Sequence, residues 1–94
     1  MKAPGHSFSN IVSAATTAVK ASPGLLRRIV VNKAVASGTI TIYNSLAGSG
    51  AKIGTITFPA TLLANQFVLD FDVNFSIGLT IVTVEANDIT VVYR

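Results

Sequence analysis

Few side chains in this sequence have the types and spacing that chemistry requires. His6 is the single histidine, and catalysis or metal binding by it would need partners from elsewhere in the chain. Asp70, Asp72 and Asn74 alternate along one stretch and offer oxygen ligands of the kind that calcium takes. On a straight strand these residues stand ~6–7 Å apart in a line, so they cannot surround an ion without loop ligands. The sequence therefore predicts no catalytic residue, no cofactor-binding residue and no metal site.

Asp70, Asp72 and Asn74 have three interpretations, of which a solvated outer face is preferred, ion pairs with another strand or subunit come second, and a metal site comes last. Arg27 and Arg28 are adjacent, so on a regular strand their side chains point to opposite faces. An inward arginine would need a carboxylate partner. The four acids of the chain all lie at or after residue 70: Asp70, Asp72, Glu85 and Asp88.

The composition is too apolar for a chain of this size. The chain has 94 residues, of which 50% are hydrophobic and 12% are charged, whereas globular chains average about 25% charged residues. A domain of this length buries only roughly 64% of the surface that its unfolded chain exposes. The excess apolar surface must then face a second copy, another protein or lipid. Lipid is the poorest of these, because the late charge-free stretch at residues 73–84 is shorter than the ~20 residues of a spanning helix.

Turn residues recur along the chain, and the segments between them are rich in β-formers, which is typical of a sandwich or small barrel. Residues 66–75 alternate apolar and polar side chains and predict a half-buried antiparallel strand. Residues 39–44 also alternate, and Gly54 marks a bulge within residues 52–58. The remaining strong segments, at residues 25–31, 79–84 and 89–93, are apolar on both faces, which predicts strands that lie centrally or have a partner covering their outer side.

The N-terminal region allows two interpretations. Ile11, Ala15 and Val19 would align on one face of a helix, but residues 16–20 lead into Ser-Pro-Gly and favour the first strand of a hairpin with residues 25–31. Residues 1–10 are predicted to be a flexible arm. The expected fold is all-β, an antiparallel β-sandwich or small barrel of about seven strands. The expected organisation is an N-terminal arm over residues 1–10 and a single β-sandwich domain over residues 11–94.

Charge is distributed unevenly along the sequence. The first six basic residues precede every acid, and the formal net charge is +3. Nucleic acid would be one partner for a basic chain, but the basic residues are dispersed and no aromatic stacking platform accompanies them. The preferred interpretation is that a positive part of one copy meets a negative part of the next.

Two stretches carry a resemblance to a known group of proteins. They are LLRRIVVNKAVASGTITIYN at residues 25–44 and FSIGLTIVTVEANDITVVYR at residues 75–94. Together with the Ile-x-Thr-Ile segment at residues 53–56, they resemble small all-β virion structural proteins of tailed bacteriophages, of the capsid decoration or cement type. The paired arginines, and a short connection at residues 85–88 where a glycine-rich loop is common, depart from the pattern of that group.

The resemblance implies a non-enzymatic component of the capsid exterior, which binds and stabilises the assembled head. Its implied partners are the major capsid protein and further copies of itself, as a dimer or trimer, with no membrane. A tail, fibre-base or head–tail accessory protein is the alternative within the virion, and a carbohydrate or cell-surface binding module is the alternative outside that class. The residues expected at the interface are Phe8, Ile11, Val12, Arg27, Arg28, Val82, Val84 and Tyr93.

Overall fold

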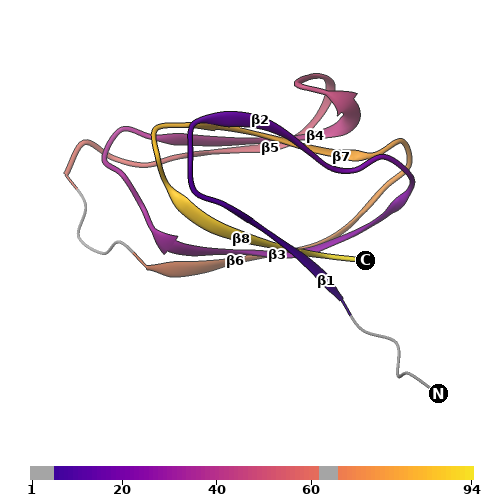
Figure 1. The fold of residues 1–94 in the computed structure, drawn as a ribbon, viewed down its shortest axis with the longest axis horizontal. Coiled ribbons are helices and arrows are strands. Elements are labelled where there is room, and N and C mark those ends of the chain that lie inside the picture. Colours follow the sequence, from indigo (N-terminus) through magenta and orange to yellow (C-terminus); the bar gives the residue numbers. More distant parts are fainter. Residues whose placement is uncertain (1–5, 62–65) are drawn as a thin grey trace.

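The computed structural model describes residues 6–61 and 66–94, and within these residues eight β-strands form two antiparallel sheets (Figure 1). Sheet A has the order β1-β8-β3-β6, with bounds Ser7–Ile11, Asp88–Tyr93, Gly24–Lys33 and Phe67–Phe75. Sheet B has the order β2-β7-β4-β5, with bounds Ala15–Lys20, Leu79–Val84, Thr39–Ala47 and Ser49–Thr57. The predicted all-β antiparallel sandwich is confirmed.

The strand pairs are nested in the sequence. The first strand pairs with the last (β1 with β8), and the pairs β2 with β7, β3 with β6 and β4 with β5 follow inward. The pairs β3 with β8 and β4 with β7 then complete the two sheets. A long antiparallel ribbon rolled up in this way is a jelly roll, the sandwich built from two Greek keys.

The core lies between the two sheets and is made by the inward residues of every second position. On β6 the alternation is regular, because Leu69, Phe71 and Val73 face inward while Asp70 and Asp72 face solvent. The buried apolar residues are Ile11, Leu26, Ile29, Val31, Ala34, Ile40, Ile42, Phe58, Phe75, Leu79, Ile81, Ile89 and Val91. They come from both sheets, so the layers share one core.

The three segments that are apolar on both faces form β3, β7 and β8, and each has a strand on both sides. Their predicted central position is confirmed. The strand interpretation of residues 16–20 is also confirmed, because they belong to β2, and the helix interpretation is wrong. The expected hairpin with residues 25–31 is wrong, because β2 pairs with β7 in sheet B whereas β3 lies in sheet A, so the Ser-Pro-Gly segment connects the two sheets. The bulge expected at Gly54 is present: the β4–β5 register jumps between Ile42 and Tyr43, and Ile53 is the additional residue of β5.

The predicted N-terminal arm overlaps the first strand of the fold. Residues 7–10 were expected within the arm, but they form β1 together with Ile11 and pair with β8 over their whole length. Ser and Asn have low strand propensity, so the local sequence does not predict β1. Its pairing with β8 overrides this low propensity. This strand makes the count eight rather than about seven. Residues 1–5 of the predicted arm lie outside the described residues.

Candidate interaction surfaces

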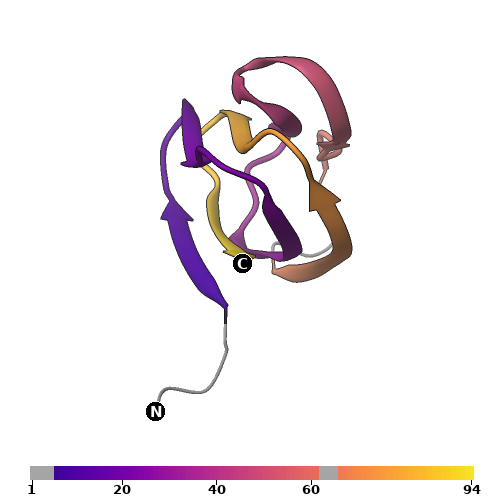
Figure 2. The ribbon, with the colours of Figure 1, turned by 90° about the vertical axis from the view of Figure 1, so that its right-hand side faces the viewer.

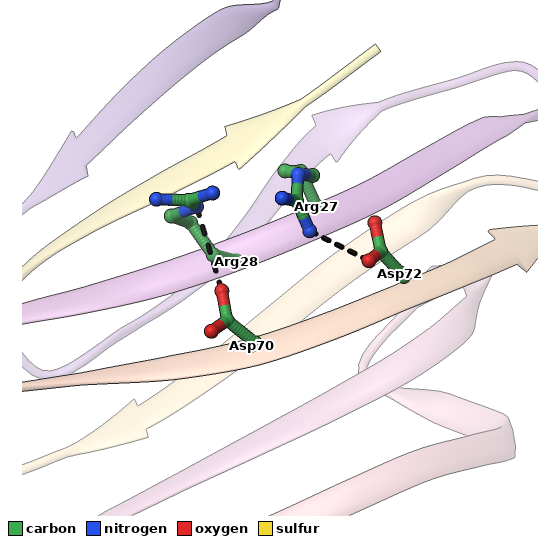
Figure 3. A network of polar contacts seen from close by, with 4 residues as sticks. All are labelled: Arg27, Arg28, Asp70 and Asp72. Carbon is green, nitrogen blue, oxygen red and sulfur yellow. Dashed lines mark hydrogen bonds and ion pairs between the residues drawn. The ribbon is translucent and has the colours of Figure 1, made fainter.

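The outer face of sheet A carries two ion pairs between β3 and β6 (Figure 3). A guanidinium nitrogen of Arg27 donates to a carboxylate oxygen of Asp72 at 2.6 Å. Arg28 approaches Asp70 with a nitrogen–oxygen distance of 3.6 Å. The second interpretation of these acids, ion pairing with another strand, therefore describes them better than a purely solvated face.

The two arginines lie on the same face of the sheet, and the prediction that they point to opposite faces is wrong. The reason is a β-bulge: the registers of β3 with β6 and with β8 both jump between Leu26 and Arg28. Asp72 adopts a positive φ of 53° opposite this jump. The irregularity shifts the inward positions of β3, so that Leu26 and Ile29 are both buried although they are three residues apart.

These ion pairs contribute little to the stability of the fold. The side chains of Asp70 and Asp72 are 66% and 63% exposed, and exposed pairs contribute about 0.2–1 kcal/mol. The third interpretation, a metal site, has no support in the described part of the chain, where no group of three or more His, Cys, Asp or Glu side chains is placed to hold an ion.

A network of polar side chains attaches β1 to the rest of sheet A. The amide nitrogen of Asn10 donates to Asp88 Oδ1 at 2.8 Å, to the Ile89 carbonyl at 2.8 Å and to Thr90 Oγ1 at 3.3 Å. Asn32 on β3 donates to the same Asp88 oxygen at 3.2 Å and to the same Thr90 oxygen at 3.0 Å. These residues come from β1, β3 and β8, so no spacing within the sequence could have revealed the network.

The tip of the β4–β5 hairpin folds over the outer face of sheet B (Figure 1). A Cβ at Gly48 would lie 3.0 Å from Val82 and 3.1 Å from Thr16, so the glycine permits a close approach to both side chains. The bend is held by Thr80, whose hydroxyl donates to the Ser45 carbonyl at 2.8 Å, and by Asn44, which accepts from the Ile77 backbone at 2.9 Å. Val82, expected at an interface with a partner, is instead partly covered by its own chain.

Large apolar side chains remain exposed elsewhere on the described surface. Phe8 on β1 is 73% exposed and is the most exposed of them. It stands opposite Val92 of β8, which continues a row to Arg28 and Asp70 across the outer face of sheet A. The others lie at strand ends, in connections or on the far edge: Val12, Leu46, Val68, Ile77 and Val84.

The residues expected at the interface thus divide into two groups. Phe8, Val12 and Val84 are exposed and available to a partner. Ile11 is 5% exposed and belongs to the core, so its assignment to an interface is wrong: its side chain points between the sheets from the end of β1. Tyr93 is partly buried and packs against the core, and the two arginines are engaged with Asp70 and Asp72 of the same chain.

The two open sides of the sandwich differ in charge. On one side lie the edge strands β1 and β2, which are consecutive in the chain, and residues 7–19 contain no charged residue. On the other side lie β5 and β6, which carry exposed Lys52, Asp70 and Asp72. Figure 2 shows β1 along one margin of the molecule.

A shallow groove of about 370 Å³ opens at one end of β3 and β6. It is lined by side chains without titratable groups: Val30, Val31, Asn32, Gln66, Phe67 and Val68. His6 is exposed ahead of β1. In the described residues there is no helix of the length and apolarity needed to cross a membrane.

Comparisons of the chain with protein-family models, with curated proteins and with solved structures found no match. Its class is therefore given by topology alone, as a small jelly-roll domain.

Proposed function

We propose that this chain is a non-enzymatic structural protein of a bacteriophage virion, which decorates the capsid exterior and stabilises the assembled head. Its partners would be the major capsid protein and further copies of itself. The observation that carries the proposal is the stretch of residues 7–19 without charged residues, which forms the edge strands β1 and β2 and exposes Phe8 and Val12.

The exposed apolar side chains support the proposal that this protein binds neighbouring proteins. The side chain of Phe8 is 73% exposed and leaves a large apolar area in contact with water. Burying such a ring at an interface contributes about 1.5–3 kcal/mol to the free energy of binding. Val12 lies four residues further along the same charge-free stretch. A partner that covers both would bury the apolar surface which the small core leaves over.

The fold supports the proposal by analogy only. Jelly rolls occur in viral capsid proteins and also in lectins, and a fold does not by itself imply a function. A lectin site would be expected to present aromatic side chains on which a sugar ring stacks. The chain has no Trp and has two Tyr, of which Tyr93 packs against the core. The capsid role is therefore preferred.

The proposed mechanism is linkage between binding and assembly. A clamp that binds neighbouring subunits only in the assembled shell stabilises that shell by mass action, without any chemical step. Strand addition at an open sheet edge is a suitable form of contact, because backbone hydrogen bonds supply affinity and side chains supply specificity.

The test mixes the purified chain with empty heads of a tailed phage whose genome encodes it, followed by imaging of the particles. Added density at repeated positions of the capsid lattice is expected. Density at a single vertex would contradict decoration and assign the chain to a tail or head–tail role. The absence of bound chain, at concentrations where the protein remains folded, would contradict a virion role altogether. The Phe8→Lys variant should fold as the wild type does and bind the empty heads more weakly.

A further inference from the structure

We propose that two copies of this chain pair along β1, antiparallel and about a twofold axis, so that two A sheets join into one continuous sheet. The inference deepens the proposed function and rests on the self-association expected there. It names the contact surface, which is the outer edge of Ser7–Ile11, and the occupant, which is β1 of a second copy.

The four edge strands of the sandwich differ in how they oppose strand addition. Natural proteins protect sheet edges with charges, bulges and prolines. The edge strand β6 carries Asp70 and Asp72 together with the bulge at Asp72. The edge strand β5 carries Lys52 and the bulge at Ile53.

The two edges on the other side are less protected, and β1 is the least protected of all. The β2 register shifts between Ala18 and Lys20, and the hairpin tip lies against Thr16. The β1 register runs without interruption from Ser7 to Ile11, and the strand contains no charged residue and no proline. Among the described residues, β1 has a neighbouring strand on one side only.

β1 is also held in a conformation that can receive a strand. Ile11 anchors its end in the core, and the three hydrogen bonds from Asn10 fix its outer face to β8. An edge strand that is already ordered loses little conformational entropy when a partner strand binds. Its pairing is therefore more favourable than the pairing of a disordered terminal segment would be.

The alternation of side chains restricts the register of the pairing. Phe8 and Asn10 face outward on sheet A, while Ser9 and Ile11 lie opposite the inward residues Val91 and Ile89. Antiparallel pairing keeps inward residues opposite inward residues only when the twofold axis passes through a residue pair. An axis at Ser9 pairs all five residues of β1, with Phe8 of each copy opposite Asn10 of the other.

The charge of the chain restricts the edge at which a second copy can bind. Each chain carries a formal net charge of +3, and a twofold interface brings identical patches together. Contact through a charged strand would place like charges near one another, which is destabilising. Contact through β1 lowers this cost, because the strand itself carries no charged residue and the carboxylate beside it, Asp88, is hydrogen-bonded to Asn10 and Asn32 of the same chain.

The experiment uses the absence of Cys from the chain. Ser9→Cys introduces one thiol at the proposed axis, where opposed Cα atoms would be about 4.5–5.5 Å apart, within the range that a disulfide spans. The matched control is Thr55→Cys on β5, an exposed residue at the opposite open side. Mild oxidation should link Ser9→Cys into dimers under dilute conditions in which Thr55→Cys stays monomeric. Adding Phe8→Lys to Ser9→Cys should lower the dimer yield about tenfold, which corresponds to about 1.4 kcal/mol.

Three results would overturn the inference: a wild-type chain that stays monomeric at millimolar concentration, equal cross-linking of the two Cys variants, or Phe8→Lys without effect. A monomeric wild type that binds shells, with binding lost in Phe8→Lys, would show that a shell subunit occupies the edge instead. That result overturns the self-pairing while it supports the proposed function. Dimers linked through Ser9→Cys without any shell binding would support the self-pairing and contradict the proposed function.

Discussion

The two open sides of this sandwich differ in how well their edge strands are protected against the addition of further strands. Within residues 6–61 and 66–94, each side ends in two edge strands that have a neighbouring strand on one side only. The β5 and β6 side is protected by exposed Lys52, Asp70 and Asp72 and by two bulges. The β1 and β2 side has a charge-free stretch of residues 7–19 and exposes Phe8 and Val12.

This difference indicates which side of the sandwich remains exposed to solvent. Charges and bulges on an edge prevent the addition of further strands, so the β5 and β6 side is suited to solvent. A regular edge without charge has no such protection, and in a protein that must remain dispersed it would be a liability. We infer that the β1 and β2 side is normally covered.

The largest effect is expected from removing the anchor of β1. Ile11→Ala leaves a cavity in the core and should lower the free energy of unfolding by about 2–5 kcal/mol. Val68→Ala on β6 is the control from the protected side, where the side chain is exposed and the change should stay within about 0.5 kcal/mol. Urea denaturation measures both. Equal, small losses of unfolding free energy in the two variants would show that β1 is not anchored in the core, which would contradict its role as an ordered edge strand.

A smaller effect is expected from Asn10→Ala, which removes three side-chain hydrogen bonds from β1. The loss should be about 1–2 kcal/mol, because the hydrogen bonds are partly exposed and one of them involves a carboxylate. Asn74→Ala changes an exposed asparagine on β6 and should cost less than about 0.5 kcal/mol. Thermal unfolding of the two variants compares the edges directly, and a larger loss for Asn74→Ala would contradict the account.

Removing the acids of β6 should make the protected side resemble the unprotected one. The double variant Asp70→Asn, Asp72→Asn is expected to change the unfolding free energy by less than about 1 kcal/mol, since both pairs are exposed. It should nevertheless form assemblies larger than the wild type, which light scattering would detect. Glu85→Gln removes an acid between β7 and β8 and should leave the size unchanged. If the double variant kept the wild-type size, charge would not be what protects β6.

The smallest effect is expected from salt. Molar salt shortens the Debye length to about 3 Å, so the ion pairs of Arg27 and Arg28 are weakened by under about 1 kcal/mol. The dissociation constant for self-association should not rise, because β1 itself carries no charged residue and salt screens the repulsion between two copies of net charge +3. Sedimentation equilibrium over a salt series measures it. A dissociation constant that rises steeply with salt would favour contact between oppositely charged parts of two copies.

The sequence indicated the fold best where side-chain patterns are regular. The alternation along β6 identified a half-buried strand, and the apolar segments of β3, β7 and β8 identified three central strands. The nested pairing could not be read in this way, because alternation specifies which face is buried but not which strand lies alongside. β1 was missed because Ser7, Ser9 and Asn10 favour strands weakly, so that its pairing with β8 depends on tertiary contacts.

The surfaces were harder to predict for two physical reasons. A bulge breaks the rule of alternation locally, so Arg27 and Arg28 share a face that strict alternation would deny them. The Asn10 network joins segments nearly eighty residues apart, such as Asn10 and Asp88, and no local spacing encodes it. Of the three apolar residues of the N-terminal segment assigned to an interface, Phe8 and Val12 are exposed and Ile11 is buried, and the sequence alone did not separate them.

Hydrogen exchange at increasing protein concentration reports on each edge strand separately. Backbone amides at the free edge of β1 should become protected as the concentration rises, while those at the free edge of β6 should exchange at a constant rate. Protection that grows at β6, or at neither strand, would contradict the claim that the β1 and β2 side is where copies of this chain meet.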